Sequence, residues 1–442
     1  MSIVETKRPT DEPAGTDNDG TPRERAKSPR RLAGELIVAI VAIVALAVTT
    51  GYVDLLIVIA SIIVIVMVHE LGHFLAAKRS GMKVTEYFVG FGPRLWSFRW
   101  GETEYGIKAL PFGGYVKIPG MTNLEEVDPA DEARLYREKP FHSRLLVAVA
   151  GSAMHFLMAF VLLWALLTFV GVPDASQVQI QGLNPVDGRP GPAAVGGVHA
   201  GDVVVSVDGK TVGGSVDALT SAIRDRPDLP VTMVVTRGAR QETLTVVPAN
   251  GRSVHERNST PPAGSAPYGL IGVSLGSPTE TRSPLGAVVS TGAELGHFAW
   301  ASITGVGHLF SPSGVSQRFD QVTSAKAANR AAADGTRAQS IVGIVQTATD
   351  AAHAGAGQFL GILIVINIFF GVFNLFPMLP LDGGHVAIAV YEKIRTGRRR
   401  AMYHADVAKL MPFTWLFLMF LAILIVPALL TDILHPMANP FG

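Results

Sequence analysis

Long apolar stretches, separated by shorter polar ones, form the main pattern of the chain. Residues 1–32 are polar and rich in Pro, Asp, Thr and Arg; because they cannot bury a core, we expect a disordered cytoplasmic leader. Apolar segments then follow at residues 33–50, 54–79, 144–171, 357–390 and 411–431. A helix of about 20 apolar residues crosses the hydrocarbon core of a bilayer. The pattern therefore predicts a polytopic α-helical membrane protein.

The first apolar segment, 33–50, has two interpretations. It is either an extra N-terminal transmembrane segment or a signal peptide with a cleavage site at Ala45-Leu46-Ala47. Basic residues precede it, occur again at Lys78 and Arg79, and are frequent at residues 395–400. The excess of Lys and Arg in cytoplasmic loops places all three basic groups inside the cell. The segment 144–171 then leads outward, and the domain after it is extracytoplasmic.

The regions between the apolar segments differ in character. Residues 82–143 combine short β-like runs with a charged stretch, which predicts re-entrant β-hairpins followed by a cytoplasmic loop. Residues 175–277 alternate β-rich runs with turn signals and predict a soluble β/α module. For residues 285–340 we expect an interfacial amphipathic helix followed, from 311 onward, by a polar linker.

The composition limits the kinds of partner, catalytic site and metal site that the chain can have. Hydrophobic residues make up 48% of the chain and charged residues 17%, which agrees with a membrane protein. The net charge is only +1, and we expect no nucleic-acid partner. Cysteine is absent, so disulfides, thiolate metal sites and a cysteine nucleophile are excluded. A metal ion would have to bind through His, Asp or Glu.

The sequence His69-Glu70-Leu71-Gly72-His73 lies in the segment 54–79. In a helix the two histidines are one turn apart on one face, so both imidazoles can bind one zinc ion. Glu70 is placed to take a proton from the attacking water. Ionisable residues at membrane depth are costly unless they are paired or bind a metal, which argues against a chance occurrence.

A catalytic zinc ion usually has three protein ligands, so another part of the chain must supply the third. Asp382 is a lone carboxylate at the end of an apolar segment that Pro377, Pro380 and a glycine pair interrupt. Broken backbone at membrane depth is tolerated where it lines a cavity or is buried in protein. By itself Asp382 could be a helix cap, but beside the histidine motif it is the preferred ligand. We therefore expect one Zn²⁺ per chain.

Over roughly residues 55–430 the chain resembles the site-two protease family of intramembrane zinc metalloproteases, most of all its bacterial, actinobacterial-like branch with one PDZ domain. The residues that carry the resemblance are His69–His73, Gly90-Phe91-Gly92-Pro93, Pro111-Phe112-Gly113-Gly114-Tyr115-Val116-Lys117 and Asn374-x-x-Pro377-x-x-Pro380-Leu381-Asp382-Gly383-Gly384.

This resemblance implies roles for individual residues. His69, His73 and Asp382 would bind the zinc ion, Glu70 would be the base, and Asn374 would help to hold the substrate or the tetrahedral intermediate. It further implies that one hairpin pairs with an unwound substrate helix as an added strand, through Gly113, Gly114, Tyr115 and Val116.

The resemblance also implies a PDZ domain in 175–277, on the strength of Gly191-Pro192-Ala193-Ala194 and the run from Gly196 to Gly209. This domain would bind a peptide or the outer portion of a substrate. The implied substrates are membrane-anchored regulators such as anti-sigma factors that have already been cut once outside. The implied location is the bacterial plasma membrane, with the lipid bilayer around the protein and the zinc site toward the cytoplasmic side.

One position departs from the family pattern. His155 stands where many relatives have Asn, so it is a hydrogen-bond donor near the zinc ion, a competing ligand or a core histidine. His385 follows the glycine pair and is expected to support the ligands rather than bind the metal.

Two other functions remain open. Broken helices with intramembrane His and Asp also occur in transporters, although this sequence shows no internal repeat. An inactive relative acting as a PDZ adaptor is the other alternative, which the intact set of metal-ligating residues disfavours.

Overall fold

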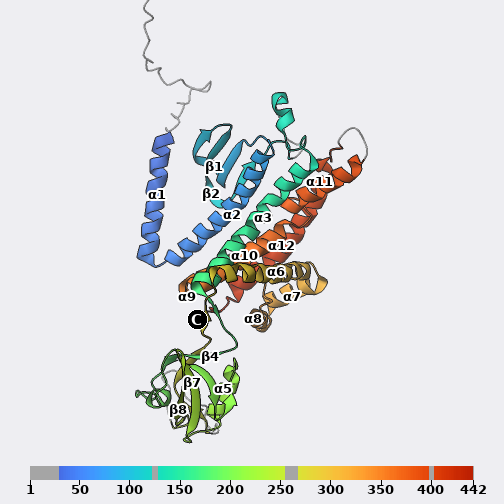
Figure 1. Cartoon of the computed structure of the whole chain (residues 1–442). Coiled ribbons are helices and arrows are strands. Elements are labelled where there is room, and N and C mark those ends of the chain that lie inside the picture. Colours follow the sequence, from blue (N-terminus) through green and yellow to red (C-terminus); the bar gives the residue numbers. More distant parts are fainter. Residues whose placement is uncertain (1–28, 122–127, 254–266, 398–402, 442) are drawn as a thin grey trace, which may run out of the picture. The chain divides into compact units, whose positions relative to one another are not determined.

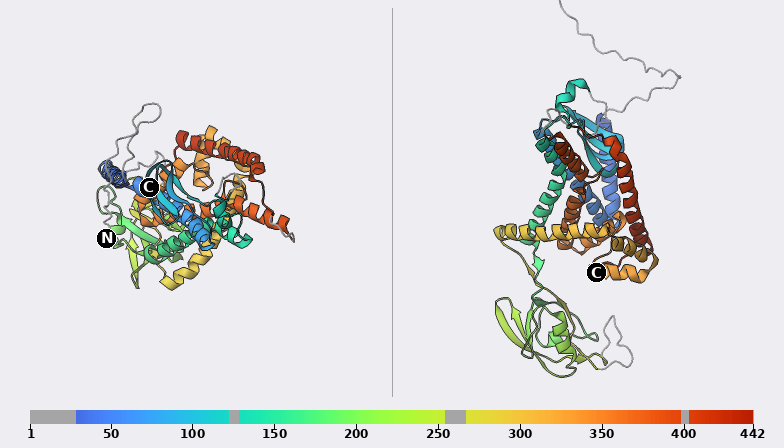
Figure 2. Two further views of the ribbon diagram at one scale, coloured as in Figure 1. Left: turned by 90° about the horizontal axis from the view of Figure 1, so that it is seen from above. Right: turned by 90° about the vertical axis from the view of Figure 1, so that its right-hand side faces the viewer.

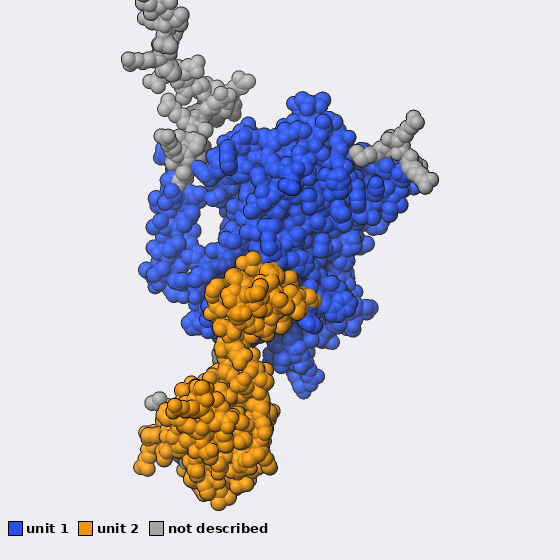
Figure 3. Space-filling view, in the orientation of Figure 1, with its two compact units in different colours: residues 1–159, 297–442 blue, residues 160–296 orange. Residues whose placement is uncertain are grey.

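The computed structural model describes residues 29–121, 128–253, 267–397 and 403–441. Most of the predicted leader, and part of the basic stretch at 395–400, lie outside these residues. The chain forms two compact units, Met1–Ala159 with His297–Gly442 and Phe160–Gly296 (Figure 3). Each unit is considered below by itself.

Four helices in the described residues are long and apolar enough to cross a membrane, which confirms a polytopic membrane protein. Three of them are α2 (Val53–Arg79), α10 (Ala356–Asn374) and α12 (Met411–Leu434). The fourth is α3 (Phe141–Ala165), which continues as one π-helical segment, Leu166–Val170. Within the first unit these spans run side by side (Figures 1 and 2). The helix α1 (Pro29–Thr50) contains a shorter apolar stretch, Gly34–Thr50, and is not among the four.

The long apolar segment at 357–390 is two helices rather than one. After α10 the chain makes a loop, and α11 (Asp382–Thr396) begins at the aspartate. Pro377 and Pro380 lie in this loop. Proline has no backbone N–H and its ring clashes with the preceding turn, so the helix cannot continue through these positions. Asp382 consequently occupies the first turn of a new helix.

Strands β1 (Glu86–Trp100) and β2 (Thr103–Lys117) form a sheet beside α2 (Figure 1). Each strand folds back on itself, because residues 86–89 pair both with 104–107 and with 114–117. Residues 114–117 have partners on one side only, so this segment is an edge of the sheet among the described residues. The short 3₁₀ helix Pro129–Arg134 follows. Side-chain hydrogen bonds from Arg134 and from Lys78 lower the pKa of Glu102 to about 2 and attach the turn between the strands to the end of α2.

Residues 284–354 are helical almost throughout, so the expected polar linker at 311–340 is wrong. The helices are α6 (Pro284–Leu309), α7 (Pro312–Thr323), α8 (Ala325–Ala333) and α9 (Ile341–Ala354). The residues before α7, α8 and α9 are Ser311, Ser324 and Ser340, and each hydroxyl accepts a hydrogen bond from the backbone N–H three residues later. Three serine caps, which initiate helices efficiently, explain the difference. In Figure 1 residues 297–309, the half of α6 in the first unit, lie across the spans.

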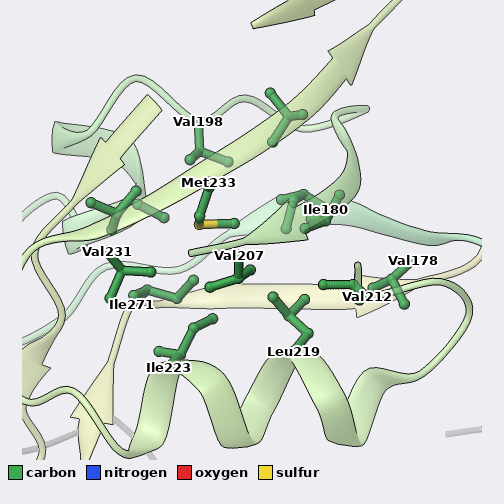
Figure 4. Close-up of a cluster of buried hydrophobic side chains, with 14 residues drawn as sticks. Val178, Ile180, Val198, Val207, Val212, Leu219, Ile223, Val231, Met233 and Ile271 are labelled. Carbon is green, nitrogen blue, oxygen red and sulfur yellow. The ribbon is translucent and has the colours of Figure 1, made fainter. Parts of the chain in front are cut away.

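The second unit contains a six-stranded sheet around an aliphatic core. The strand order is β11-β4-β5-β7-β8, with β6 paired to β5. The strands are β4 (Val178–Leu183), β5 (Val203–Val207), β6 (Lys210–Thr211), β7 (Val231–Arg237), β8 (Arg240–Val246) and β11 (Val273–Gly276). Helix α5 (Val216–Arg224), capped by Ser215, buries Leu219 and Ile223 against Ile180 and Met233 (Figure 4).

Short elements complete this unit. They are α4 (Pro192–Val195) and the pairs β3 (Val172–Pro173) with β12 (Thr279–Glu280) and β9 (Ala249–Asn250) with β10 (Gly269–Leu270). In the first unit a 3₁₀ turn, Val407–Leu410, leads into α12.

Candidate metal centre

Three side chains from two elements meet at one point in the first unit. His69 and His73 lie on one face of α2, and Asp382 begins α11. The His73 Nε2 atom is 3.3 Å from His69 Nε2 and 3.3 Å from Asp382 Oδ1, while His69 Nε2 is 3.6 Å from Asp382 Oδ2. Zinc bound tetrahedrally at about 2.0–2.1 Å holds neighbouring ligand atoms about 3.3 Å apart. The donor set and its spacing therefore fit a zinc ion with a fourth position left for water or substrate.

The backbone of α3 orients one ligand. The Nδ1 atom of His73 lies 2.7 Å from the carbonyl oxygen of Val147. A carbonyl can only accept, so Nδ1 carries the proton and Nε2 presents its lone pair to the metal position. This contact selects the tautomer that a metal ligand needs.

A glycine allows α3 to approach the ligands. If Gly151 carried a Cβ, this atom would lie 2.3 Å from Nε2 of His73 and 2.5 Å from Cε1 of His69. Gly72, between the two histidines, faces the same helix, and a Cβ there would lie 2.5 Å from the carbonyl oxygen of Ala150. Small residues at both positions allow the helices to pack closely, as is common for membrane helices.

A buried ion pair fixes the helix that carries the third ligand. Arg144 at the start of α3 binds Glu392 of α11, and both side chains are almost fully buried. Glu392 also accepts a hydrogen bond of 2.6 Å from the backbone N–H of Ala405. Closer to the metal position, the Ser152 hydroxyl lies 3.5 Å from Oδ2 of Asp382, at the limit of a hydrogen bond. These contacts hold α11 against α3.

Glu70 lies beside the ligands but is not one of the three clustered residues. Its Oε2 atom accepts a hydrogen bond of 3.1 Å from the backbone N–H of Val116, on the edge segment of the sheet. A Cβ on Gly114 would lie 2.8 Å from the sulfur of Met67 and 3.5 Å from Cγ of Glu70. The edge segment thus runs directly past the carboxylate.

The other site residues predicted from the sequence lie in different surroundings. His155 is buried next to His69, with ring centroids 4.9 Å apart, and its Nδ1 lies 3.1 Å from Oδ1 of Asn367, a fully buried residue of α10. His385 packs edge-on toward Tyr136 and is outside the ligand cluster.

Asn374 ends α10 half-buried, and its amide makes no hydrogen bond within the described ranges. Of the predicted hairpin residues, Gly113 and Tyr115 flank Gly114 on the edge segment, where the Tyr115 hydroxyl donates to Glu86.

The model of peptidase family M50 matches residues 57–421. The chain belongs to peptidase family M50. Zinc metalloprotease Rip1 of Mycobacterium tuberculosis is 33% identical over 416 residues, which cover 86% of this chain and 96% of that protein. Its counterpart in Mycolicibacterium smegmatis is 34% identical over 414 residues, with the same coverage. The probable membrane metalloprotease ARASP2, chloroplastic, of Arabidopsis thaliana is 29% identical over 337 residues, covering 76% of this chain and 70% of that protein.

Membership of family M50 makes the chain a zinc metalloprotease, which confirms the enzyme class and the cofactor expected from the sequence. The His69, His73 and Asp382 cluster is the group of described residues that could hold this ion. Sequence analysis missed the residues that position the cluster: Val147, Gly151, Asn367, Arg144 and Glu392. A signal existed for Arg144 and Glu392, since both are charged residues close to apolar segments.

Proposed function

We propose that this protein hydrolyses a peptide bond within the transmembrane segment of a membrane-anchored protein. His69, His73 and Asp382 hold one zinc ion, and Glu70 is the general base. The observation that supports this most strongly is the spacing of 3.3 to 3.6 Å among the donor atoms of three side chains, two on a membrane-spanning helix and one in the first turn of α11.

The zinc ion would supply one part of the chemistry, and side chains of the protein would supply the other. A zinc ion at this position polarises the substrate carbonyl and makes water more acidic. Glu70 takes a proton from the attacking water, whose oxygen bonds to the carbonyl carbon, and then passes that proton to the nitrogen of the breaking C–N bond. Asn374, eight residues before Asp382, is placed on the loop side of α10 to help hold the tetrahedral intermediate.

The edge segment is the proposed docking site for the unwound substrate. A helical substrate keeps its amides in internal hydrogen bonds and has to be extended before water reaches one of them. Residues Gly113, Gly114, Tyr115 and Val116 offer an open edge, and the Val116 N–H points away from β1, toward Glu70. A strand added at this edge places its backbone beside the base.

Replacing Val116 by proline tests this role. Proline at an edge position with an outward N–H preserves the pairing with β1 and removes only the outward donor. We expect Val116→Pro to keep its zinc and to cleave a single-span substrate about 10- to 100-fold more slowly, because a hydrogen bond to a charged or reacting group is lost. Val116→Ala keeps the N–H and should cleave at nearly the native rate. Native cleavage by the proline variant would reject the docking edge.

The function itself is tested with purified protein in detergent and a tagged single-span membrane protein as substrate. We expect fragments whose new termini, determined by mass spectrometry, lie inside the span. A zinc chelator should abolish cleavage and added zinc should restore it. Asp382→Asn should lose most of its bound metal, because an amide oxygen is a weaker and uncharged ligand. Cleavage that survives both treatments would contradict the proposal, and native protein that binds zinc without cutting any span would favour the adaptor alternative.

The predictions from the sequence about the membrane, the second unit and the substrates are part of this proposal. The protein would lie in a bacterial plasma membrane with the zinc site toward the cytoplasm, and the second unit would be an extracytoplasmic PDZ domain. Its sheet and helix α5 around one core support this interpretation. The substrates would be regulators such as anti-sigma factors whose extracytoplasmic part has already been shortened.

Trimmed substrates should then be cut faster than the same substrates with a folded outer domain. Equal rates would contradict selection of substrates by the size of their outer domain.

A further inference from the structure

Helix α7 carries a buried arginine that forms no ion pair with any residue the structure describes. Arg318 is only 7% exposed, and its Nε and Nη1 atoms are buried without a hydrogen-bond partner. One turn along the same face, Gln321 is 3% exposed, and its amide makes no hydrogen bond within the described part of the chain. The neighbouring carboxylate, Asp320, is exposed and forms no ion pair there. The guanidinium and the amide thus lie on one face of α7, three residues apart, and neither has a hydrogen-bond acceptor among the described residues.

The other buried arginines are different. Arg144 and Arg337 are as deeply buried as Arg318, and each has a carboxylate partner, Glu392 and Asp432 respectively. A buried charge without a partner costs several kcal/mol. Burial also lowers the pKa of Arg318, because the side chain has lost water without gaining an anion. Among the described residues this cation has no acceptor.

The surroundings of Arg318 indicate the source of this acceptor. Helix α7 lies across the C-terminal end of α12, a membrane span (Figures 1 and 2). His435, just after α12, contacts the Val322 carbonyl through Nε2 at 3.1 Å, and Arg318 lies four residues before Val322, about 6 Å along the helix. The end of a span lies at the depth of the lipid headgroups.

Both helices also expose apolar side chains. The last turns of α12 expose Ile433 and Leu434, at 62% and 57%, and α7 exposes Phe319, at 50%. Exposed aliphatic side chains at the end of a span suit acyl chains, and an arginine at headgroup depth suits a phosphate, which it can bind with two parallel hydrogen bonds.

We propose that Arg318 and Gln321 form a binding site for the phosphate of a phospholipid, whose acyl chains lie against the exposed end of α12. The lipid neutralises the guanidinium and fastens α7 to the span. This site is separate from the metal centre and does not depend on the proteolytic function.

Thermal unfolding of the delipidated protein in detergent tests the site with three additions: dioleoyl phosphatidylglycerol, dioleoylglycerol and inorganic phosphate. We expect phosphatidylglycerol to raise the unfolding midpoint by about 5 °C, as a ligand well above its Kd does. Dioleoylglycerol has the same chains without phosphate and should have no such effect. Inorganic phosphate at the same concentration should also have none, and an equal shift with either control would overturn the lipid site.

Three variants complete the experiment. Arg318→Met removes the charge at similar length and should abolish the shift, while its midpoint without lipid equals or exceeds the native one, since the unpaired charge is gone. Arg330→Met makes the same change at an exposed position of α8 and should keep the full shift. Arg318→Lys retains the charge without the planar fork and should show a reduced shift. A full shift in Arg318→Met, or an equal loss of stability with and without lipid, would overturn the proposal.

Discussion

Glu70→Gln should bind zinc at the native stoichiometry and cleave a single-span substrate about 100- to 10,000-fold more slowly, the usual contribution of a general base. Glutamine has the same shape as glutamate, and its carbonyl oxygen can still accept the hydrogen bond from the Val116 N–H. The proposed metal ligands are untouched, because Glu70 is outside the cluster of His69, His73 and Asp382. The change therefore removes the proton acceptor and leaves the site assembled. Zinc is measured by elemental analysis and cleavage by the rate of fragment formation.

The matched control is Glu280→Gln, the same substitution at an exposed position of the second unit, which should cleave like the native chain. Equal rates for the native chain and Glu70→Gln would mean that another residue is the base or that a contaminating protease produces the fragments. Loss of zinc in Glu70→Gln would mean that the carboxylate also supports the ligands.

Gly151→Ala should lose the metal site although it adds only one methyl group. The new Cβ would lie 2.3 Å from Nε2 of His73 and 2.5 Å from Cε1 of His69, so either the imidazoles or helix α3 must move. Movement of α3 also displaces the Val147 carbonyl that orients His73. Displaced ligands and supports typically lower metal affinity 10- to 100-fold, and we expect cleavage to fall by about 100-fold or more.

Gly361→Ala is the control for this substitution, because it lies within the α10 span and a Cβ there meets no atom within 4 Å. It should retain zinc and native cleavage, and its helix should be slightly more stable. If Gly151→Ala kept both zinc and activity, the close approach of α3 to the ligands would not be a requirement of the site.

The parts of the site that depend on local spacing could be predicted from the sequence. His69 and His73 are four residues apart in an apolar helix, and helix geometry alone brings them to one face. Asp382 could be proposed because few carboxylates occur near broken apolar segments. The four spans followed from length and hydropathy, and the structure confirms a polytopic membrane protein.

The remaining features depend on how distant segments pack, which spacing does not encode. Nothing in the sequence around Gly151 shows that its missing side chain makes room for two imidazoles. The partner of His155, Asn367, lies 212 residues away, and only the fold brings them together. Residues 311–340 were misjudged for another reason: their polar composition suggested a linker, while serine caps and alanine-rich turns form helices.

The residues that we propose as metal ligands come from distant parts of the chain. About 300 residues separate His73 from Asp382, so synthesis of the first span yields only two of the three ligands. The newly made protein therefore remains without a complete centre until α11 has left the ribosome and packed against α3. Proteolytic competence then arises only late in synthesis, and chains truncated before α11 would insert into the bilayer without a complete metal centre.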